Sequence, residues 1–315
     1  MKWRFFTTLL FITSILNAQQ VLRFYDYKWH PIEAKYAAYY SIMDKEDSLW
    51  TKNDYFVSNH KLQMQGHYTD TLCKVAEGTF YYFYPNGNLQ KKASFIHGKK
   101  NGTSLSYYEN NMMSDSLTYD HDKVVGISAG WYRDGTQKDS TNNINDSVTV
   151  DINWFDNAVP SSAGRYLYGK KTGPWVYYNK KGILTAKEQY KDDILLSKTY
   201  YSEDGKEIDT LKNKDRVATF PGGDNAWTEW LYKNLYTPVN VQLANTDKVV
   251  VVVSFEINEE GKLVNESVVT PFHDEYDSIL IKVLRKSPKW KPSVAKNRNV
   301  TTVFSQAVFF KEVEN

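Results

Sequence analysis

The chain has little of what several common protein classes depend on. Its 315 residues include a single cysteine, Cys73, so no disulfide can form within the chain. There are only 9 prolines and no proline-rich run. A disulfide-stapled fold and a long proline-rich spacer are therefore both excluded.

Excess charge is also missing. The 39 Lys and Arg residues nearly balance 37 Asp and Glu residues, which leaves a formal charge of +2. The charges are interspersed, so the chain has no polybasic patch to attract nucleic acid. We expect no nucleic-acid partner.

Catalytic motifs are scarce. The segment from Gly126 to Gly130 matches the Gly-x-Ser-x-Gly nucleophile elbow, but that motif requires a helix directly after it. Here the aromatic pair Trp131-Tyr132 and a turn follow instead. The 6 histidines lack the spacing of metal ligands. We predict no catalytic residue, no metal site and no cofactor, and hence no enzyme.

The one long apolar run is at the N-terminus. Phe5 to Leu16 follows Lys2 and Arg4 and precedes Ala18, the pattern of a secretory signal peptide. The run is shorter than the roughly 20 residues that a spanning helix needs. We predict a cleaved signal over residues 1–18 and a periplasmic protein; an uncleaved anchor is the alternative.

Aromatic residues are abundant, at 15%, and they are periodic. Aromatic pairs recur at steps of 24, 24, 23, 23 and 23 residues. The pairs are Phe83-Tyr84, Tyr107-Tyr108, Trp131-Tyr132, Trp154-Phe155, Tyr177-Tyr178 and Tyr200-Tyr201. Such a fixed interval indicates an internal structural repeat.

Turn signals follow these pairs, as in Asn86-Gly87 and Asp204-Gly205. Steps of this type supply the positive φ of tight hairpins, so each unit is predicted to be strand, turn, strand. We expect residues 55–210 to form a long antiparallel repeat sheet, with residues 19–54 as its N-terminal cap. The unit around Gly173 to Tyr178 resembles the MORN-type repeat, which implies a scaffolding or interaction role.

The pattern changes in residues 211–315. Apolar spacing predicts helices near 226–235 and 276–284, the first with Asp224 as its N-cap. Val249 to Ile257, Leu263 to Val269 and Val300 to Phe310 are predicted strands. The expected unit is a small α+β domain.

Its landmarks form a recognisable set. They are Phe220-Pro221-Gly222-Gly223, Leu235-Tyr236-x-Pro238, the alternating run from Val251 to Gly261, Pro288-Lys289-Trp290-Lys291-Pro292 and Val308-Phe309-Phe310. The segment resembles the C-terminal domain of TonB, in its Bacteroidetes-type form. A glycine usual before the first strand and a Glu-Ala pair usual in the second helix are missing.

The TonB resemblance implies that an extended peptide from an outer-membrane receptor, or from another envelope protein, is added to a sheet edge. By position, the implied peptide-binding edge is Val300, Thr301, Thr302, Val303, Phe304, Ser305 and Gln306. An ordinary edge, or one closed by a second copy in a homodimer, is the alternative.

The predicted fold class is thus a β-rich N-terminal antiparallel repeat sheet, MORN-like, plus a small α+β C-terminal domain, TonB-like. The predicted function is that of a periplasmic binding protein that captures a receptor peptide, with TonB-dependent transport as the process it serves. The alternative is a structural envelope protein that acts through its repeats, with the C-terminal domain used for dimerisation or attachment.

Overall fold

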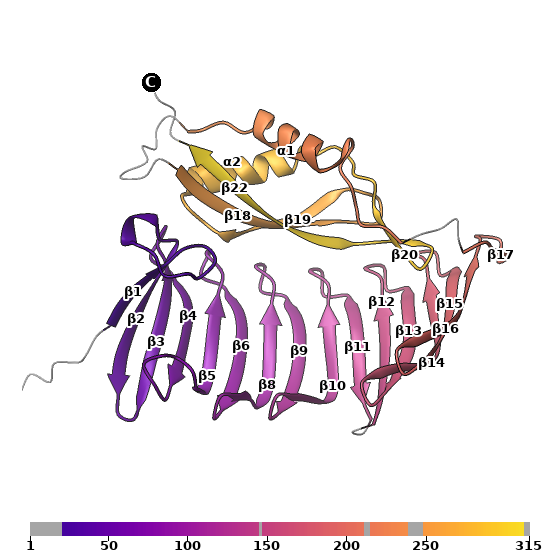
Figure 1. Ribbon diagram of the computed structural model, residues 1–315, viewed down its shortest axis with the longest axis horizontal. Coiled ribbons are helices and arrows are strands. Elements are labelled where there is room, and N and C mark those ends of the chain that lie inside the picture. The colour runs from indigo at the N-terminus through magenta and orange to yellow at the C-terminus, as the bar shows by residue number, and fades with distance from the viewer. Residues whose placement is uncertain (1–20, 145–146, 211–214, 239–247, 312–315) are drawn as a thin grey trace, which may run out of the picture.

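The computed structural model describes residues 21–144, 147–210, 215–238 and 248–311. Its dominant element is a 17-stranded antiparallel sheet, called the array below, in which the strands pair in chain order, with β6 pairing with both β7 and β8. The strands stand side by side along the long axis of the molecule (Figure 1). Strands β7 and β8 both pair with β6 and share one position, so with about 4.8 Å between strands the array is roughly 72 Å long.

The array strands are β1 (Val21–Tyr25), β2 (Tyr39–Glu46), β3 (Leu49–Phe56), β4 (Leu62–Tyr68), β5 (Ala76–Phe83), β6 (Leu89–Ile96), β7 (Lys99–Lys100), β8 (Gly102–Tyr107), β9 (Met113–Asp120), β10 (Lys123–Trp131), β11 (Gln137–Asn143), β12 (Val148–Trp154), β13 (Pro160–Leu167), β14 (Lys170–Tyr178), β15 (Leu184–Lys191), β16 (Ile194–Tyr201) and β17 (Glu207–Ile208). A 3-10 turn, η1 (Ala34–Tyr36), precedes β2.

Every predicted aromatic pair lies at the end of a strand, next to a turn on the upper rim of the array as drawn in Figure 1. Tyr107 ends β8 and Trp131 ends β10, for example, and a turn from Tyr132 to Thr136 follows β10, with the Gly135 N–H donating to the carbonyl of Tyr132. The glycine there has φ +87°, a conformation that other residues adopt at a cost. The repeat period is therefore the length of one hairpin plus its lower turn.

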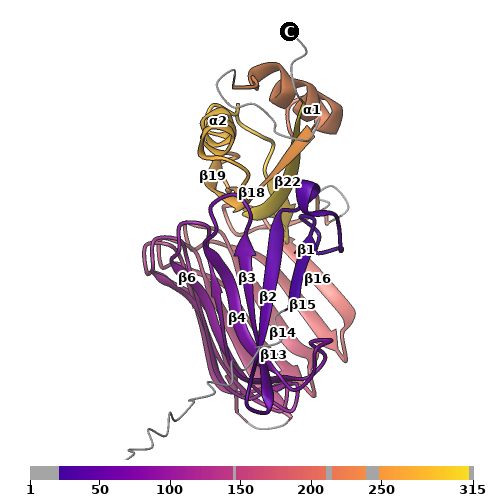
Figure 2. The same cartoon turned by 90° about the vertical axis from the view of Figure 1, so that its left-hand side faces the viewer.

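Residues 215–238 and 248–311 form a second layer, called the C-terminal layer below. It comprises α1 (Gly223–Asn234), β18 (Lys248–Ile257), β19 (Leu263–Thr270), α2 (Asp274–Leu284), β20 (Ser293–Ala295), β21 (Arg298–Val300) and β22 (Thr302–Lys311). Strands β19, β18 and β22 make a three-stranded sheet in that order. This layer lies along the upper rim of the array in both side views (Figures 1 and 2).

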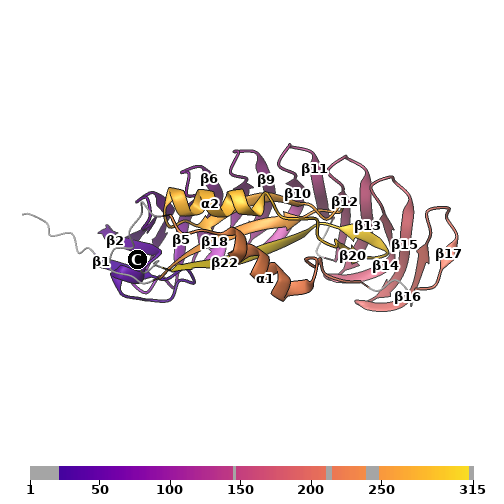
Figure 3. The same cartoon turned by 90° about the horizontal axis from the view of Figure 1, so that it is seen from above.

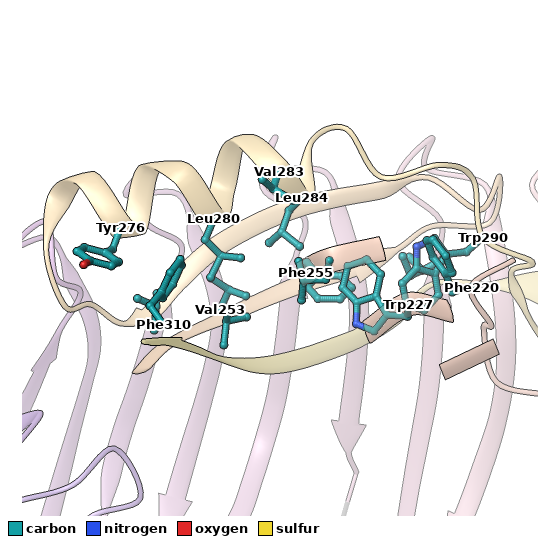
Figure 4. Packing of buried hydrophobic residues seen from close by; sticks show 14 of the residues in the cluster. Phe220, Trp227, Val253, Phe255, Tyr276, Leu280, Val283, Leu284, Trp290 and Phe310 are labelled. Atoms are coloured by element: carbon teal, nitrogen blue, oxygen red, sulfur yellow. The ribbon is translucent and has the colours of Figure 1, made fainter. Parts of the chain in front are cut away.

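The largest core cluster lies between the three-stranded sheet and its helices. Alternate residues of β18, such as Val253 and Phe255, point into it and meet Leu280 of α2 and Trp227 of α1 (Figure 4). Trp290 closes one end, with its ring 5.0 Å from that of Trp227. Seen from above, α1 flanks β22, and α2 lies on the other side of the layer (Figure 3).

The predicted fold class is wrong. The chain is nearly all antiparallel sheet, with 56% of residues in strands and 9% in helices, and one 17-stranded sheet dominates it. Both helices that the apolar spacing predicts are present, but they have only 12 and 11 residues. These two helices cover one face of the three-stranded sheet. They contribute too few residues for the chain to be classed as α+β.

Two local expectations also need correction. Asp224 lies inside the first turn of α1, and the N-cap is Gly222 with φ 91°. The predicted last strand, Val300 to Phe310, is divided: Val300 belongs to β21, and β22 begins at Thr302. The β20–β21 hairpin was not foreseen.

Candidate functional site

The predicted peptide-binding residues are distributed over two strands. Val300 ends β21, Thr301 joins the strands, and Thr302 to Gln306 form the first half of β22. Strand β22 pairs with β18 from Thr302 to Lys311 and has no strand on its other side among the described residues. It is therefore an edge strand of the three-stranded sheet.

Helix α1 covers one half of this edge. The backbone N–H of Phe309 donates to the Tyr232 hydroxyl at 3.4 Å. The side chain of Gln306 donates to the carbonyl of Ala307 at 2.8 Å and accepts from the Trp227 indole at 3.1 Å. Backbone groups of β22 that face away from β18 are thus occupied at Ala307 and Phe309.

The other half of the edge is open. In an antiparallel ladder, backbone groups alternate between the two sides of a strand. Since Phe309 and Ala307 face outward, Ser305 and Val303 face outward as well. Within the described residues, no hydrogen bond is made to the outward backbone groups of these two residues. Two N–H and two C=O groups are available there to an added strand.

The two faces of β22 have different surroundings. Phe304, Val308 and Phe310 contribute to the core beneath the helices. Val303 is 65% exposed, and Phe309, 42% exposed, places its ring 6.4 Å from that of Tyr27 in the array. A strand added to this edge would have one row of side chains toward the array.

A ladder of tyrosines ties the array's upper turns together. The hydroxyls of Tyr84, Tyr108 and Tyr132 each donate, at 2.8 Å, to a backbone carbonyl at the end of the next repeat's aromatic strand. The next residue in this register is Phe155, which has no hydroxyl to donate. The ladder therefore stops in the middle of the array.

Arg298 from the β20–β21 hairpin occupies the place where the ladder stops. Its guanidinium lies over the Phe155 ring, 5.4 Å from the centroid, and over the Tyr177 ring at the same distance. One Nη donates to the carbonyl of Tyr178 at 2.7 Å and also to the carbonyl of Ser161. The hairpin thus brings hydrogen-bond donors to the place where the array has Phe155 and no tyrosine hydroxyl.

Lys296, at the tip of the same hairpin, pairs with a buried carboxylate. Its ammonium lies 2.8 Å from Glu188, whose other oxygen accepts from the hydroxyls of Tyr177 and Tyr190. Burial by itself raises the pKa of the Glu188 carboxyl. The charge of Lys296 and the hydrogen bonds that Lys296, Tyr190 and Tyr177 donate lower it by more, so this pKa lies below its ordinary value. Glu188 is therefore a charged anchor for the hairpin.

Further contacts fix the C-terminal layer along the array. Lys180 of the array bridges Asp156 and Glu259, each at 2.9 Å, and Glu259 lies in the turn between β18 and β19. At the opposite end, Tyr39 and Thr270 share a hydrogen bond of 2.9 Å between buried side chains. The layer is held at both ends, and the open half of the β22 edge lies in the same layer.

A cavity of about 800 Å³ lies beside the hairpin. Array residues such as Lys180 and Tyr201 line one side, and Arg216, Lys289 and Asn299 of the C-terminal layer line the other.

Among the residues described, no group of three or more His, Cys, Asp or Glu is arranged to hold a metal ion. Ser128, from the Gly-x-Ser-x-Gly match rejected as a nucleophile elbow, lies within strand β10 and donates to the carbonyl of Thr141 at 3.5 Å.

Sequence reasoning missed the hairpin anchor for a physical reason. Strands β20 and β21 have three residues each, too short for a periodicity. One signal was present: Lys296 and Asn297 form a two-residue turn, both with positive φ, as a tight hairpin requires. A second signal is Phe155, which is the one Phe at the second position of an aromatic pair.

The predicted leader, residues 1–18, lies outside the described residues. Within the described part of the chain, neither helix has the length and apolar character to cross a bilayer.

No family model matches the chain, and no curated protein matches it.

Proposed function

We propose that the protein is a periplasmic binding protein of the cell envelope that captures an extended peptide by strand addition at Val303 and Ser305. The observation that carries the proposal is the half-open edge of β22. An extended chain that pairs there gains up to four backbone hydrogen bonds without displacing a backbone hydrogen bond of the described residues.

The resemblance of residues 211–315 to the TonB C-terminal domain supports the choice of peptide. It favours a segment from an outer-membrane receptor, and it favours a role in TonB-dependent transport. The hydrogen bonds and ion pairs that join the C-terminal layer to the array support a second part of the proposal: the array acts as a platform that positions the edge.

The test uses the full chain without its leader. Val303→Pro removes an outward N–H that β18 does not use, so the ladder with β18 is retained. Val303→Thr is the matched control, because it changes the side chain and keeps the donor. Circular dichroism and thermal melts first establish that both variants are folded.

Pull-down from envelope extract is then combined with hydrogen exchange. We expect outer-membrane receptors to be recovered by the wild type and by Val303→Thr but not by Val303→Pro. The amides of Val303 and Ser305 should exchange quickly in the free protein and slowly with the recovered receptor peptide. Equal recovery by all three proteins would reject strand addition and favour the scaffolding alternative, with partners on the array.

A further inference from the structure

The cavity beside the β20–β21 hairpin, called the junction cavity below, lies where the two layers meet. Its volume of about 800 Å³ is within the range of about 300–1,000 Å³ that is typical of small-ligand sites. The turns after β14 and β16 form one wall, and the hairpin, the β18–β19 turn, Arg216 and Lys289 form the other. The described residues that line it include none of β22, so the cavity is separate from the edge proposed to bind a peptide.

The charged side chains of the junction cavity do not balance. The cations of its walls are Lys180, Lys181, Arg216, Lys289 and Arg298, and the carboxylates are Glu203, Glu259 and Glu260. Lys180 lies 2.9 Å from Glu259 and 3.7 Å from Glu260. Lys181 pairs with Glu203 at 3.0 Å. Every carboxylate of the walls is therefore already matched by a lysine.

Arg216 and Lys289 are the cations left over. Both side chains are exposed, and within the described residues neither has a carboxylate partner or a side-chain hydrogen bond. Arg298 differs, because its guanidinium donates to the carbonyls of Ser161 and Tyr178. A guanidinium and an ammonium without counter-charges attract an oxyanion, and the guanidinium can hold a carboxylate or a phosphate through two parallel hydrogen bonds.

The uncharged part of the walls offers both donors and acceptors. Within the described residues, the Tyr201 hydroxyl, the Nδ2 amide of Asn179 and the Oδ1 atom of Asn299 take part in no hydrogen bond. A sugar hydroxyl donates one hydrogen bond and accepts others, so it suits groups of both kinds. An apolar ligand would leave these groups without partners, which costs free energy.

We propose that the junction cavity binds a carbohydrate that carries carboxylate or phosphate groups. Arg216 and Lys289 hold the acidic groups, and Asn179, Tyr201 and Asn299 hydrogen-bond to the sugar hydroxyls. Because these residues come from both layers, the bound carbohydrate also ties the C-terminal layer to the end of the array. The two cations are exposed, so the affinity falls as the salt concentration rises.

Isothermal titration calorimetry of the leaderless chain at low salt tests the ligand class. Trigalacturonic acid carries carboxylates, glucose 1,6-bisphosphate carries phosphates, maltotriose is neutral and inorganic phosphate has no sugar. We expect an acidic sugar to bind about tenfold more tightly than maltotriose and than inorganic phosphate, and the better of the two acidic sugars identifies the acidic group. Binding of neither acidic sugar at millimolar concentration, or equal binding of maltotriose or of inorganic phosphate, would overturn the proposal.

Substitutions then test whether the acidic sugar binds in this cavity. Arg216→Gln and Lys289→Gln each remove one unpaired charge, so we expect an unchanged thermal melt and a loss of affinity of about tenfold in each. Lys291→Gln is the matched control, because Lys291 is an exposed lysine of the same segment that does not line the cavity. It should bind like the wild type. Unchanged affinity in both cavity variants, or an equal loss in Lys291→Gln, would overturn the site.

Discussion

At the scale of single residues, Arg298 shows how a buried charge is tolerated at a junction. Burial lowers the pKa of Arg298 to about 10, and the nearby Tyr177 and Glu259 oppose that shift. The guanidinium remains charged at neutral pH. Its bonds to the carbonyls of Ser161 and Tyr178 compensate for lost water.

Asp277 in α2 is the opposite case, a carboxyl whose charge the fold disfavours. Burial raises the pKa of Asp277 to about 6, and the negative charge of Asp274 raises it further. The backbone N–H of Phe272, which donates to the Asp277 carboxylate at 3.1 Å, acts in the opposite direction and lowers this pKa. The unfolded chain has an ordinary aspartate, with a pKa near ~3.9. Stability is therefore greatest when the group is protonated and falls as the pH rises from about 4 to about 6.

Asp277→Asn should remove this loss, since the amide keeps the acceptor for Phe272 and carries no charge. We expect the variant to be more stable than the wild type by about 1–2 kcal/mol at pH 7.5, measured by urea unfolding, and equal to it at pH 3.5. Glu275→Gln, a carboxylate in the same helical turn that does not act on Asp277, is the control. A gain of the same size at both pH values would contradict the assignment.

At the scale of elements, two strands of the array need a glycine where an aromatic ring of the neighbouring strand packs against their backbone. A Cβ on Gly164 of β13 would lie 2.1 Å from the Trp175 ring of β14. Gly66 of β4 has the same relation to Phe80 of β5, at 2.2 Å. The ring lies where a side chain would otherwise stand, so these strands require glycine.

Gly164→Ala should therefore destabilise the array by about 2–3 kcal/mol, because Trp175 is buried and cannot move aside. Gly130→Ala is the control: its Cβ would meet the carboxylate of Asp139, the end of a side chain that can rotate away. Urea midpoints of both variants test the difference. Equal losses would show that the ring at residue 175 adapts.

At the scale of the whole molecule, the hairpin anchor joins two layers that each have a core. The array has its own cluster around Trp175 and Tyr177, and the C-terminal layer has another around Phe255 and Leu280. Tertiary contacts at Arg298, Lys296 and Lys180 couple them. Coupled layers should unfold together.

Arg298→Ala should uncouple them, because it leaves two carbonyls without donors and removes the ring stacking. We expect a single thermal transition to separate into two, and the radius of gyration from small-angle X-ray scattering to increase. Arg285→Ala removes an exposed arginine of the same layer, 66% accessible and paired with Glu266, and should change neither quantity. An unchanged single transition in Arg298→Ala would show that the remaining contacts suffice.

The sequence by itself determined the array, its period and the places of its aromatic pairs, because these depend on local pairing of neighbouring segments. Hairpins need only strand propensity and turn residues that adopt positive φ, both visible in the chain. The segments that became α1, α2 and the strands of the C-terminal layer were also predictable, since apolar periodicity follows from burial of one face.

Only the tertiary structure decided the fold class, the anchor and which half of the β22 edge is open. Arg298 meets Ser161 and Tyr178 across more than a hundred residues, and Tyr232 of α1 covers the N–H of Phe309 from another element. Such contacts depend on how finished layers fit together. No local pattern encodes that fit, because the partners of each group are chosen by three-dimensional packing and by the need to satisfy buried polar groups.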